Sequence, residues 1–260
     1  MRLFTVSDLH IDYESNKRWL EGLSNADYKE DAVIVAGDIS DSDQWLKTAF
    51  AHLVDKFKHV VFVPGNHDLW ITRGPHSDSL EKFAWVMDTC RDYGLITARQ
   101  VLGTFDITPL FSWYDYSFAS LNAQIQQVWA DFQCCYWSDG VEAAAQYFHD
   151  MNEATNINAN ASDHSLTTIT VSHFLPTLAV LPTYIPRRFD YLWPVLGSTT
   201  LGQQVNAIAP RIHIYGHSHV NTQKTIRGTV YVNNALGYPS EPNTRKSLLQ
   251  IPMSDSPGQC

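Results

Sequence analysis

The sequence is short of basic residues, of cysteine and of long hydrophobic runs, and each shortage excludes a class of protein. Lys and Arg number 18 against 27 Asp and Glu, so the 260-residue chain has a formal net charge of −9 at pH 7. Duplex-binding proteins present a basic stripe, so we expect no dedicated nucleic-acid binding. The four cysteines show neither CxxC spacing nor the density of a disulfide scaffold. No apolar run approaches the roughly 20 residues that span a bilayer, so we expect no membrane insertion.

The composition of the chain is that of a packed globular domain. Hydrophobic residues make up 44% and charged residues 17%, which excludes a disordered chain. At 260 residues the chain can bury a large core, and no linker, repeat or low-complexity tract divides it. We therefore expect residues 1–260 to form a single domain, and the sequence leaves its oligomeric state open.

Five short polar clusters recur along the chain, and several of them directly follow a run of apolar, β-prone residues. They are Asp8-Leu9-His10, Gly37-Asp38, Gly65-Asn66-His67-Asp68, His173 and Gly216-His217-Ser218-His219. The preceding runs predict strands at residues 2–7, 32–36, 60–63, 167–172 and 212–215. Ligands collect at the carboxyl ends of strands in open α/β sheets, so we expect the five clusters to meet at that edge.

The side chains of these clusters are donors for divalent cations. Carboxylate and amide oxygens together with imidazole nitrogens suit manganese, iron or zinc, with positions left for water and substrate. One carboxylate can bridge two cations about 3.5–4 Å apart, the separation at which a metal pair holds a phosphoryl group. Asp38 is the expected bridge, and the sequence thus predicts a centre with two divalent metal ions. Taken alone, each motif also fits an ordinary turn, cap or polar loop.

In this order, Asp-x-His, Gly-Asp-x-x-Asp, Gly-Asn-His-Asp, a lone His and Gly-His-x-His resemble the calcineurin-like metallophosphoesterase family. The resemblance implies two sets of metal ligands and one bridging carboxylate: Asp8, His10 and His219; Asn66, His173 and His217; and the bridge Asp38. It implies that His67 faces the phosphate and helps the leaving oxygen depart, with Asp41 orienting it. The fold that it implies is of the α/β class, a four-layer αββα sandwich of two mixed β-sheets flanked by helices.

For function, the resemblance implies hydrolysis of a phosphate ester by attack of a hydroxide shared between the two ions. The third motif ends in Asp68 and the second lacks the Arg-Gly of the protein Ser/Thr phosphatases, so the chain is more similar to phosphodiesterases and phosphomonoesterases of small molecules. We expect a small-molecule or nucleotide-like phosphate ester as the substrate. A nuclease of the same fold and a non-catalytic metal-binding scaffold are the alternatives.

Two segments outside the motifs are candidates for substrate contacts. An aromatic-rich insertion is expected at about residues 105–150, and Trp113 and Tyr114 in it are candidates for a wall that stacks on an organic leaving group. The alternative is a hydrophobic cluster beneath a long insertion. In the proline-rich segment after His173, Arg187 and Arg188 are candidates to grip a phosphate. The alternative is a solvated surface pair.

Apolar spacing and capping residues predict three helices and two late strands. A helix is expected to follow the cap at residues 41–43 and to continue to Phe57, and a second begins near Asp78 with Glu81 three residues on. A third is expected at residues 141–151, and strands at 229–232 and 248–251.

A cleavable signal peptide of roughly 15 residues or more would remove Asp8, so we expect a cytoplasmic location.

Overall fold

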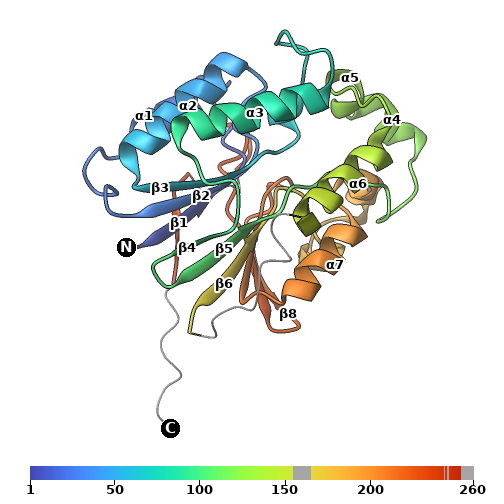
Figure 1. Cartoon of the computed structure of the whole chain (residues 1–260). Helices are drawn as coiled ribbons and strands as arrows, with labels where there is room; N and C mark the ends of the chain where they lie inside the picture. The colour runs from blue at the N-terminus through green and yellow to red at the C-terminus, as the bar shows by residue number, and fades with distance from the viewer. Residues whose placement is uncertain (155–164, 243, 245, 253–260) are drawn as a thin grey trace.

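The computed structural model describes residues 1–154, 165–242, 244 and 246–252, and Cys260 lies outside these residues. Two β-sheets pack face to face, and helices lie on their outer sides (Figure 1). The predicted αββα sandwich is confirmed. Among the described residues, no helix combines the length and the apolarity that crossing a membrane requires.

The first sheet contains the strands that precede the first three polar clusters. Its order is β10 (Leu249–Ile251), β1 (Leu3–Val6), β2 (Ala32–Ala36) and β3 (His59–Val63). The strands β1, β2 and β3 are parallel, and β10 is antiparallel to β1. Parallel pairing places the carboxyl ends of the three strands at one edge, which is where the first three clusters emerge.

The second sheet carries the last two clusters. Its order is β4 (Gln100–Leu102), β5 (Phe105–Pro109), β6 (Thr167–Val171), β7 (Ile212–Tyr215), β9 (Thr229–Asn233) and β8 (Thr222–Ile226). The four central strands are parallel, and the edge strands β4 and β8 are antiparallel to their neighbours. All seven strands predicted from the sequence are present.

Alternation along the buried strands produces the layers. Along β2, Ala32, Ile34 and Ala36 belong to the apolar cluster between the two sheets, whereas Val33 and Val35 belong to the cluster that includes the helices. Successive side chains of a strand point to opposite faces, so a strand that is apolar at every position is buried on both sides. The continuous apolar run of β2 is thus a consequence of its place in the second of four layers.

Helices on the first sheet come from the amino-terminal half of the chain. They are α1 (Glu14–Glu21), α2 (Asp43–Lys56) and α3 (Ser79–Tyr93) (Figure 1). The predicted helices after residue 43 and near residue 78 are therefore confirmed. At the start of α3, the carboxylate of Asp78 accepts a hydrogen bond of 2.7 Å from the backbone N–H of Glu81. The helix ends at Gly94, whose φ of 73° is the left-handed conformation that glycine adopts readily.

Helices on the second sheet are α6 (Val141–Asn152), as predicted, and α7 (Thr199–Ile208) (Figure 1). Short helices complete the chain: α4 (Ala123–Val128), α5 (Asp131–Cys134) and the 3₁₀ segments η1 (His67–Leu69), η3 (Leu178–Val180) and η4 (Arg187–Val195). The segment predicted as an insertion at 105–150 begins with β5, which is a strand of the second sheet. The segment inserted after this strand of the second sheet therefore starts after Pro109 and not at residue 105.

A buried histidine in this core is expected to make stability depend on pH. His213 is fully buried, with Nδ1 2.8 Å from the Thr170 hydroxyl and Nε2 3.1 Å from the Ser172 hydroxyl. Burial lowers its pKa to about 3, so between that value and the ordinary pKa the unfolded chain binds a proton that the folded chain excludes. The free energy of unfolding should therefore fall by about 1.4 kcal/mol per pH unit as pH drops through this window.

The test compares the parent with His213→Gln, which keeps a polar side chain but does not titrate. Urea unfolding between pH 7 and about 4 should show a shallower decline of the unfolding free energy in the variant. Equal declines in the two proteins would show that protonation of His213 does not contribute.

Candidate metal centre

The first group of predicted ligands meets at the carboxyl edge of both sheets. Asp8 and His10 follow β1, and His219 follows β7. Nε2 of His219 lies 3.2 Å from Nε2 of His10 and 3.2 Å from Oδ1 of Asp8. The other ring nitrogen of His219 donates to the carboxylate of Glu241 at 2.7 Å, so Nε2 is directed at the cluster.

The second group lies beside it and comes from β3, β6 and β7. Oδ1 of Asn66 lies 3.1 Å from Nε2 of His173 and 3.0 Å from Nδ1 of His217, and the two nitrogens are 3.2 Å apart. The far nitrogen of His173 donates to the carbonyl of Ala36 at 2.8 Å, and that of His217 to the carbonyl of Val195 at 3.0 Å. Carbonyls only accept, so in the neutral rings the nitrogens that face Asn66 carry lone pairs.

Asp38 lies between the two groups. Its Oδ2 is 3.4 Å from Nε2 of His173 and 3.9 Å from Nε2 of His10. Its Oδ1 accepts a 2.9 Å hydrogen bond from the backbone N–H of His67. The carboxylate belongs to one group of converging donor atoms with His10 and His67 and to another with His173 and His217.

The spacing of the donor atoms fits divalent cations. Ligand atoms about 2.0–2.1 Å from a tetrahedral zinc ion lie roughly 3.3 Å apart. The separations within each group are 3.0–3.2 Å, and all the atoms are lone-pair donors in suitable protonation states. Side chains without such a purpose rarely direct so many acceptors at one another, because uncompensated acceptors in a buried place are costly. The residues present therefore fit the metal centre that the sequence predicts.

The backbone at the cluster is held in an uncommon conformation. Among the described residues, eight non-glycine residues have positive φ, and five of them are predicted metal ligands: Asp8 (53°), His10 (41°), Asp38 (57°), His217 (66°) and His219 (52°). Such residues cost on the order of 1–3 kcal/mol each and are known to gather at functional sites. The concentration of strain here is independent support for a functional role of this edge.

Glycines permit the loops to approach so closely. A Cβ on Gly37 would lie 2.5 Å from Nδ1 of His173, and a Cβ on Gly65 would overlap Oδ1 of Asp38. Both distances are shorter than real Cβ contacts, so a side chain at either position would displace a predicted ligand. Gly37 and Gly65 are therefore positions where the lack of a Cβ permits this close approach.

Asp68 ties the second and third motifs together. Its Oδ2 accepts from the backbone N–H groups of Asp38 and Gly65, each at 2.8 Å. Its Oδ1 accepts from Ile39 at 2.8 Å and Ser40 at 3.1 Å. The carboxylate is fully buried, and its four hydrogen bonds fix the loop that positions Asp38.

Burial and neighbouring charges shift the pKa values of the predicted ligands. Burial would raise the pKa of Asp8, but the adjacent His219 lowers it to about 2. Burial opposes charge on His219 and His173, yet their carboxylate neighbours raise the pKa of His219 to about 10 and of His173 to about 9. Burial lowers the pKa of His217 to about 3. A charged ring must lose its proton before it binds a cation, so binding here is coupled to proton release.

His67 borders the cluster, and its surroundings differ from the prediction. Its ring stacks on Trp70 with centroids 3.8 Å apart, and Nε2 lies 3.3 Å from the hydroxyl of Tyr238. Asp41, expected to orient His67, instead accepts a 2.6 Å hydrogen bond from Arg73, and no Asp41–His67 hydrogen bond occurs in the described part of the chain. The guanidinium is the stronger partner because it is always charged.

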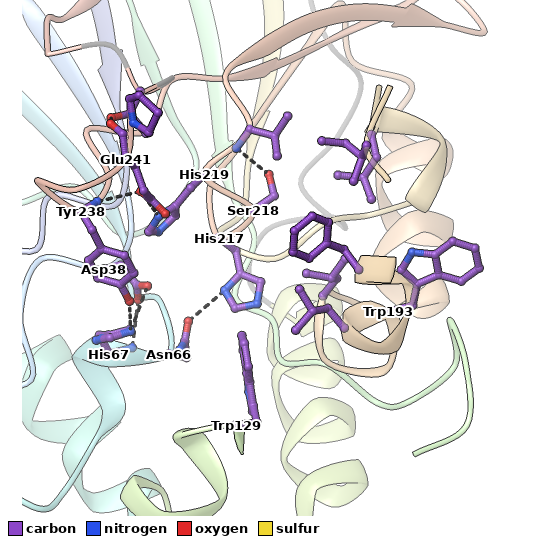
Figure 2. Close-up of a pocket in the computed structure, with 18 residues that line it drawn as sticks. Asp38, Asn66, His67, Trp129, Trp193, His217, Ser218, His219, Tyr238 and Glu241 are labelled. Atoms are coloured by element: carbon purple, nitrogen blue, oxygen red, sulfur yellow. Dashed lines mark hydrogen bonds and ion pairs between the residues drawn. The ribbon is translucent and has the colours of Figure 1, made fainter. Parts of the chain in front are cut away.

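A pocket of about 500 Å³ opens beside the cluster (Figure 2). One side is formed by cluster residues, including Asp38, Asn66, His67, His217 and His219. The opposite side is largely apolar: Trp129, Leu181, Ile185, Phe189, Leu192, Trp193 and Leu196. The volume is that of a typical small-ligand site.

The four side chains predicted as substrate contacts do not line this pocket. Trp113 and Tyr114 are each 1% exposed and pack in the hydrophobic core, so the alternative of a buried aromatic cluster is the correct one. Arg187 and Arg188 are exposed on η4, whose next residue, Phe189, does face the pocket. A large aromatic side chain gains most by full burial, which explains the places of Trp113 and Tyr114.

Several residues at the site were missed from the sequence. Tyr238 stacks on His10 with centroids 4.5 Å apart, Glu241 bonds to His219, and Trp193 forms part of the pocket wall. Trp129 also lines the pocket, and it belongs to the aromatic-rich segment that the sequence offered as a substrate wall. Tyr238 and Glu241 follow β9 at the same sheet edge as the motifs. That strand was predicted, and its carboxyl end is the one signal that points to them.

Comparisons with known proteins place the chain in a family. A sequence profile described as "Calcineurin-like phosphoesterase" matches residues 1–221. The acyl-carrier-protein phosphodiesterase PptH of Mycobacterium tuberculosis is 25% identical over 266 residues, which cover 94% of this chain and 80% of that protein. The crystal structure of phosphopantetheinyl hydrolase from the same organism matches with a TM-score of 0.79 and 23% identity, covering 99% of this chain and 98% of the other, and it shows the same fold. The chain belongs to the calcineurin-like phosphoesterase family and is a metal-dependent hydrolase of phosphate esters.

Proposed function

We propose that the two donor groups bind two divalent cations, with the carboxylate of Asp38 shared between them. Manganese, iron and zinc are the ions that this mixture of carboxylate, amide and imidazole donors favours. When bound, they would supply an activated water and neutralise charge on the phosphate. The donor atoms of Asp8, His10 and His219 lie within 4.8 Å of one another, as do those of Asp38, His173 and His217, and this convergence supports the assignment.

His67 is the proposed general acid for the leaving oxygen. Its Nε2 lies 3.9 Å from Oδ2 of Asp38, which places the ring at the wall shared by the cluster and the pocket. We assign its orientation to Trp70 and Tyr238, which contact the ring directly. Asp41 has the weaker proposed role of a negative charge near His67, since its hydrogen bond goes to Arg73.

For the substrate, we propose a phosphodiester that joins a phosphopantetheinyl arm to an acyl carrier protein. The relative is an acyl-carrier-protein phosphodiesterase, and the match spans most of both chains. The sequence indicated a small-molecule or nucleotide-like ester, whereas this proposal places the phosphodiester on a protein, as in the name of the relative.

The apolar side of the pocket is the observation that carries this choice. A phosphate held at the metal cluster leaves the wall of Trp193, Leu192 and Leu196 to contact whatever is esterified to it. A phosphomonoester of a small polar alcohol gains little from such a wall. A long uncharged arm gains burial of apolar surface at about 25 cal/mol per Å².

The test is the loss of the arm from a carrier protein. Purified chain with added manganese should remove the phosphopantetheinyl group from a holo acyl carrier protein, as followed by intact-protein mass spectrometry. A chelator should stop the reaction, because cations activate the water. A chromogenic phosphomonoester, a chromogenic phosphodiester and a DNA strand serve as comparison substrates.

Three outcomes contradict the proposal. Turnover of the monoester with an intact carrier protein would indicate a phosphomonoesterase. Cleavage of DNA alone would indicate the nuclease alternative. Absence of turnover with every substrate, although cations are bound, would favour the scaffold alternative.

Trp193→Ala is expected to weaken binding of the arm. Removing an apolar wall that contacts substrate in both ground and transition states should raise KM about 10-fold and leave kcat unchanged. Tyr184→Ala is the matched control, because Tyr184 lies on the same segment but is 73% exposed and does not line the pocket. Steady-state kinetics on the holo carrier protein would show the difference, and an unchanged KM in Trp193→Ala would remove Trp193 from the arm site.

A further inference from the structure

The buried carboxylate of Asp131 lies behind the metal cluster and accepts hydrogen bonds from three side chains, one of which is a predicted metal ligand. Asp131 is the first residue of α5 and is 2% exposed. Its Oδ1 accepts from Nδ2 of Asn66 at 2.9 Å and from Nε1 of Trp70 at 2.7 Å. Its Oδ2 accepts from Nε1 of Trp129 at 2.8 Å. We propose that Asp131 is a positioning residue that directs the amide oxygen of Asn66 toward the cation, an inference that rests on the proposed metal centre.

The argument begins with the amide of Asn66. An amide has one end that accepts and one that donates, and it binds cations through its oxygen. A carboxylate only accepts, so the NH₂ of Asn66 must face Asp131. The oxygen is then turned toward Nε2 of His173 and Nδ1 of His217, at 3.1 and 3.0 Å. Without Asp131, either end of the amide could point at the cation.

The same carboxylate fixes two aromatic side chains. Trp70 stacks beneath His67 with an interplanar angle of 27°, and Trp129 lines the pocket with its ring 5.7 Å from that of His217. Both indoles are held by hydrogen bonds to Asp131. Burial, together with the nearby charge of Asp131, raises the pKa of the Tyr114 hydroxyl well above the usual range. Asp131 thus links the aromatic segment after Pro109 to the metal cluster.

Hydrogen-bonding partners of this kind are known to matter for metal sites. Loss of a group that orients a ligand commonly costs 10–100-fold in metal affinity. The effect should be confined to the cation near Asn66, because no hydrogen bond among the described residues joins Asp131 to Asp8, His10 or His219.

The experiment measures cation binding rather than turnover. Manganese is titrated into the cation-free full-length chain by calorimetry, with the parent, Asp131→Leu and Asp131→Asn compared. Leucine fills a similar volume but accepts no hydrogen bond, so one of the two sites should weaken by roughly 10–100-fold. Asparagine retains one oxygen, which can accept from Asn66 and Trp70, so Asp131→Asn should recover most of the lost affinity.

The control is Asp106→Leu. Asp106 is 1% exposed and is paired with Arg99 at 2.7 Å, so its loss tests the general effect of replacing a buried carboxylate. This variant should lose stability but keep the affinity of the parent for both cations. Should Asp131→Leu fail to fold, Asp131→Ala makes the same comparison with a smaller side chain.

The outcomes separate this inference from the proposals on which it depends. Binding of two cations by the parent tests the metal centre, and the difference between variants tests Asp131. A folded Asp131→Leu that binds both cations as the parent does would overturn the inference. So would an Asp131→Asn variant as weak as Asp131→Leu, because the role then would not lie in accepting a hydrogen bond. Substrate identity does not enter the measurement.

Discussion

Replacing Asp38 with asparagine is expected to remove both cations together and to abolish hydrolysis. The carboxylate has Oδ2 3.4 Å from the ring of His173 in one donor group and 3.9 Å from that of His10 in the other. An amide has a single oxygen and no charge. If that oxygen accepts from the N–H of His67 as Oδ1 does, the NH₂ takes the place of Oδ2 beside both groups. With two cations no longer held, kcat/KM should fall by at least about 10³-fold, because their charge contributes several kcal/mol to the transition state.

Elemental analysis and hydrolysis of a phosphodiester in added manganese measure the two effects in one preparation. Asp31→Asn is the control, because Asp31 is a buried carboxylate (5% exposed) next to β2 and lies outside the donor groups. Among the described residues, its side chain bonds to Arg2. It should retain metal and activity. Full activity in Asp38→Asn with manganese present would show that the reaction does not need a shared carboxylate.

The sequence was sufficient to predict the strands and the ligands that follow them, because the signals for both are local in the chain. Each of the strands β1, β2, β3, β6 and β7 is a short run of β-prone residues that stops at a turn residue, and each predicted ligand follows such a stop. Parallel pairing then brings the strand ends to one edge without further information. For the same reason the donor groups around Asp38 and Asn66 could be expected before their geometry was known.

The residues that were missed depend on contacts between distant parts of the chain. Tyr238 reaches His67 across 171 positions, and Asp131 reaches Asn66 across 65. Neither lies in a motif, and a lone Tyr or Asp in a loop carries no distinguishing pattern. Arg73 was likewise invisible as the partner of Asp41, since a salt bridge depends on how two loops fold. The single domain and the cytoplasmic location stay predictions.

The positions of the ligands in the sequence could be predicted, but their backbone conformation could not, because that conformation is strained. Five ligands adopt positive φ, which is uncommon for residues other than glycine even though Asp and His adopt it more often than most. The strands fix one side of each loop, and the four hydrogen bonds of Asp68 fix the loop of Asp38. Tertiary contacts therefore maintain a backbone geometry that local sequence would not choose, as is common where function needs it.

Replacing His67 with asparagine is expected to separate turnover from metal binding. His67 contributes its backbone N–H to Asp38, which any residue supplies, whereas its ring faces the pocket and stacks on Trp70. The variant should keep both cations and lose roughly 10²–10⁴-fold in kcat, the usual contribution of a positioned proton donor. His76→Asn is the matched control, because the His76 side chain is 5% exposed and bonds to Asp43 at 2.9 Å, outside the pocket.

The dependence on the leaving group gives the sharper form of this test. A general acid matters most when the departing oxygen is basic, so the loss in His67→Asn should be large for an alkyl phosphodiester and small for a nitrophenyl one. Elemental analysis should find the same metal content in both proteins, since the His67 ring contributes to neither of the three-residue sets proposed as ligands. A loss of equal size for both leaving groups would assign His67 to binding or to positioning of the phosphate, because proton donation cannot help a group that departs without a proton.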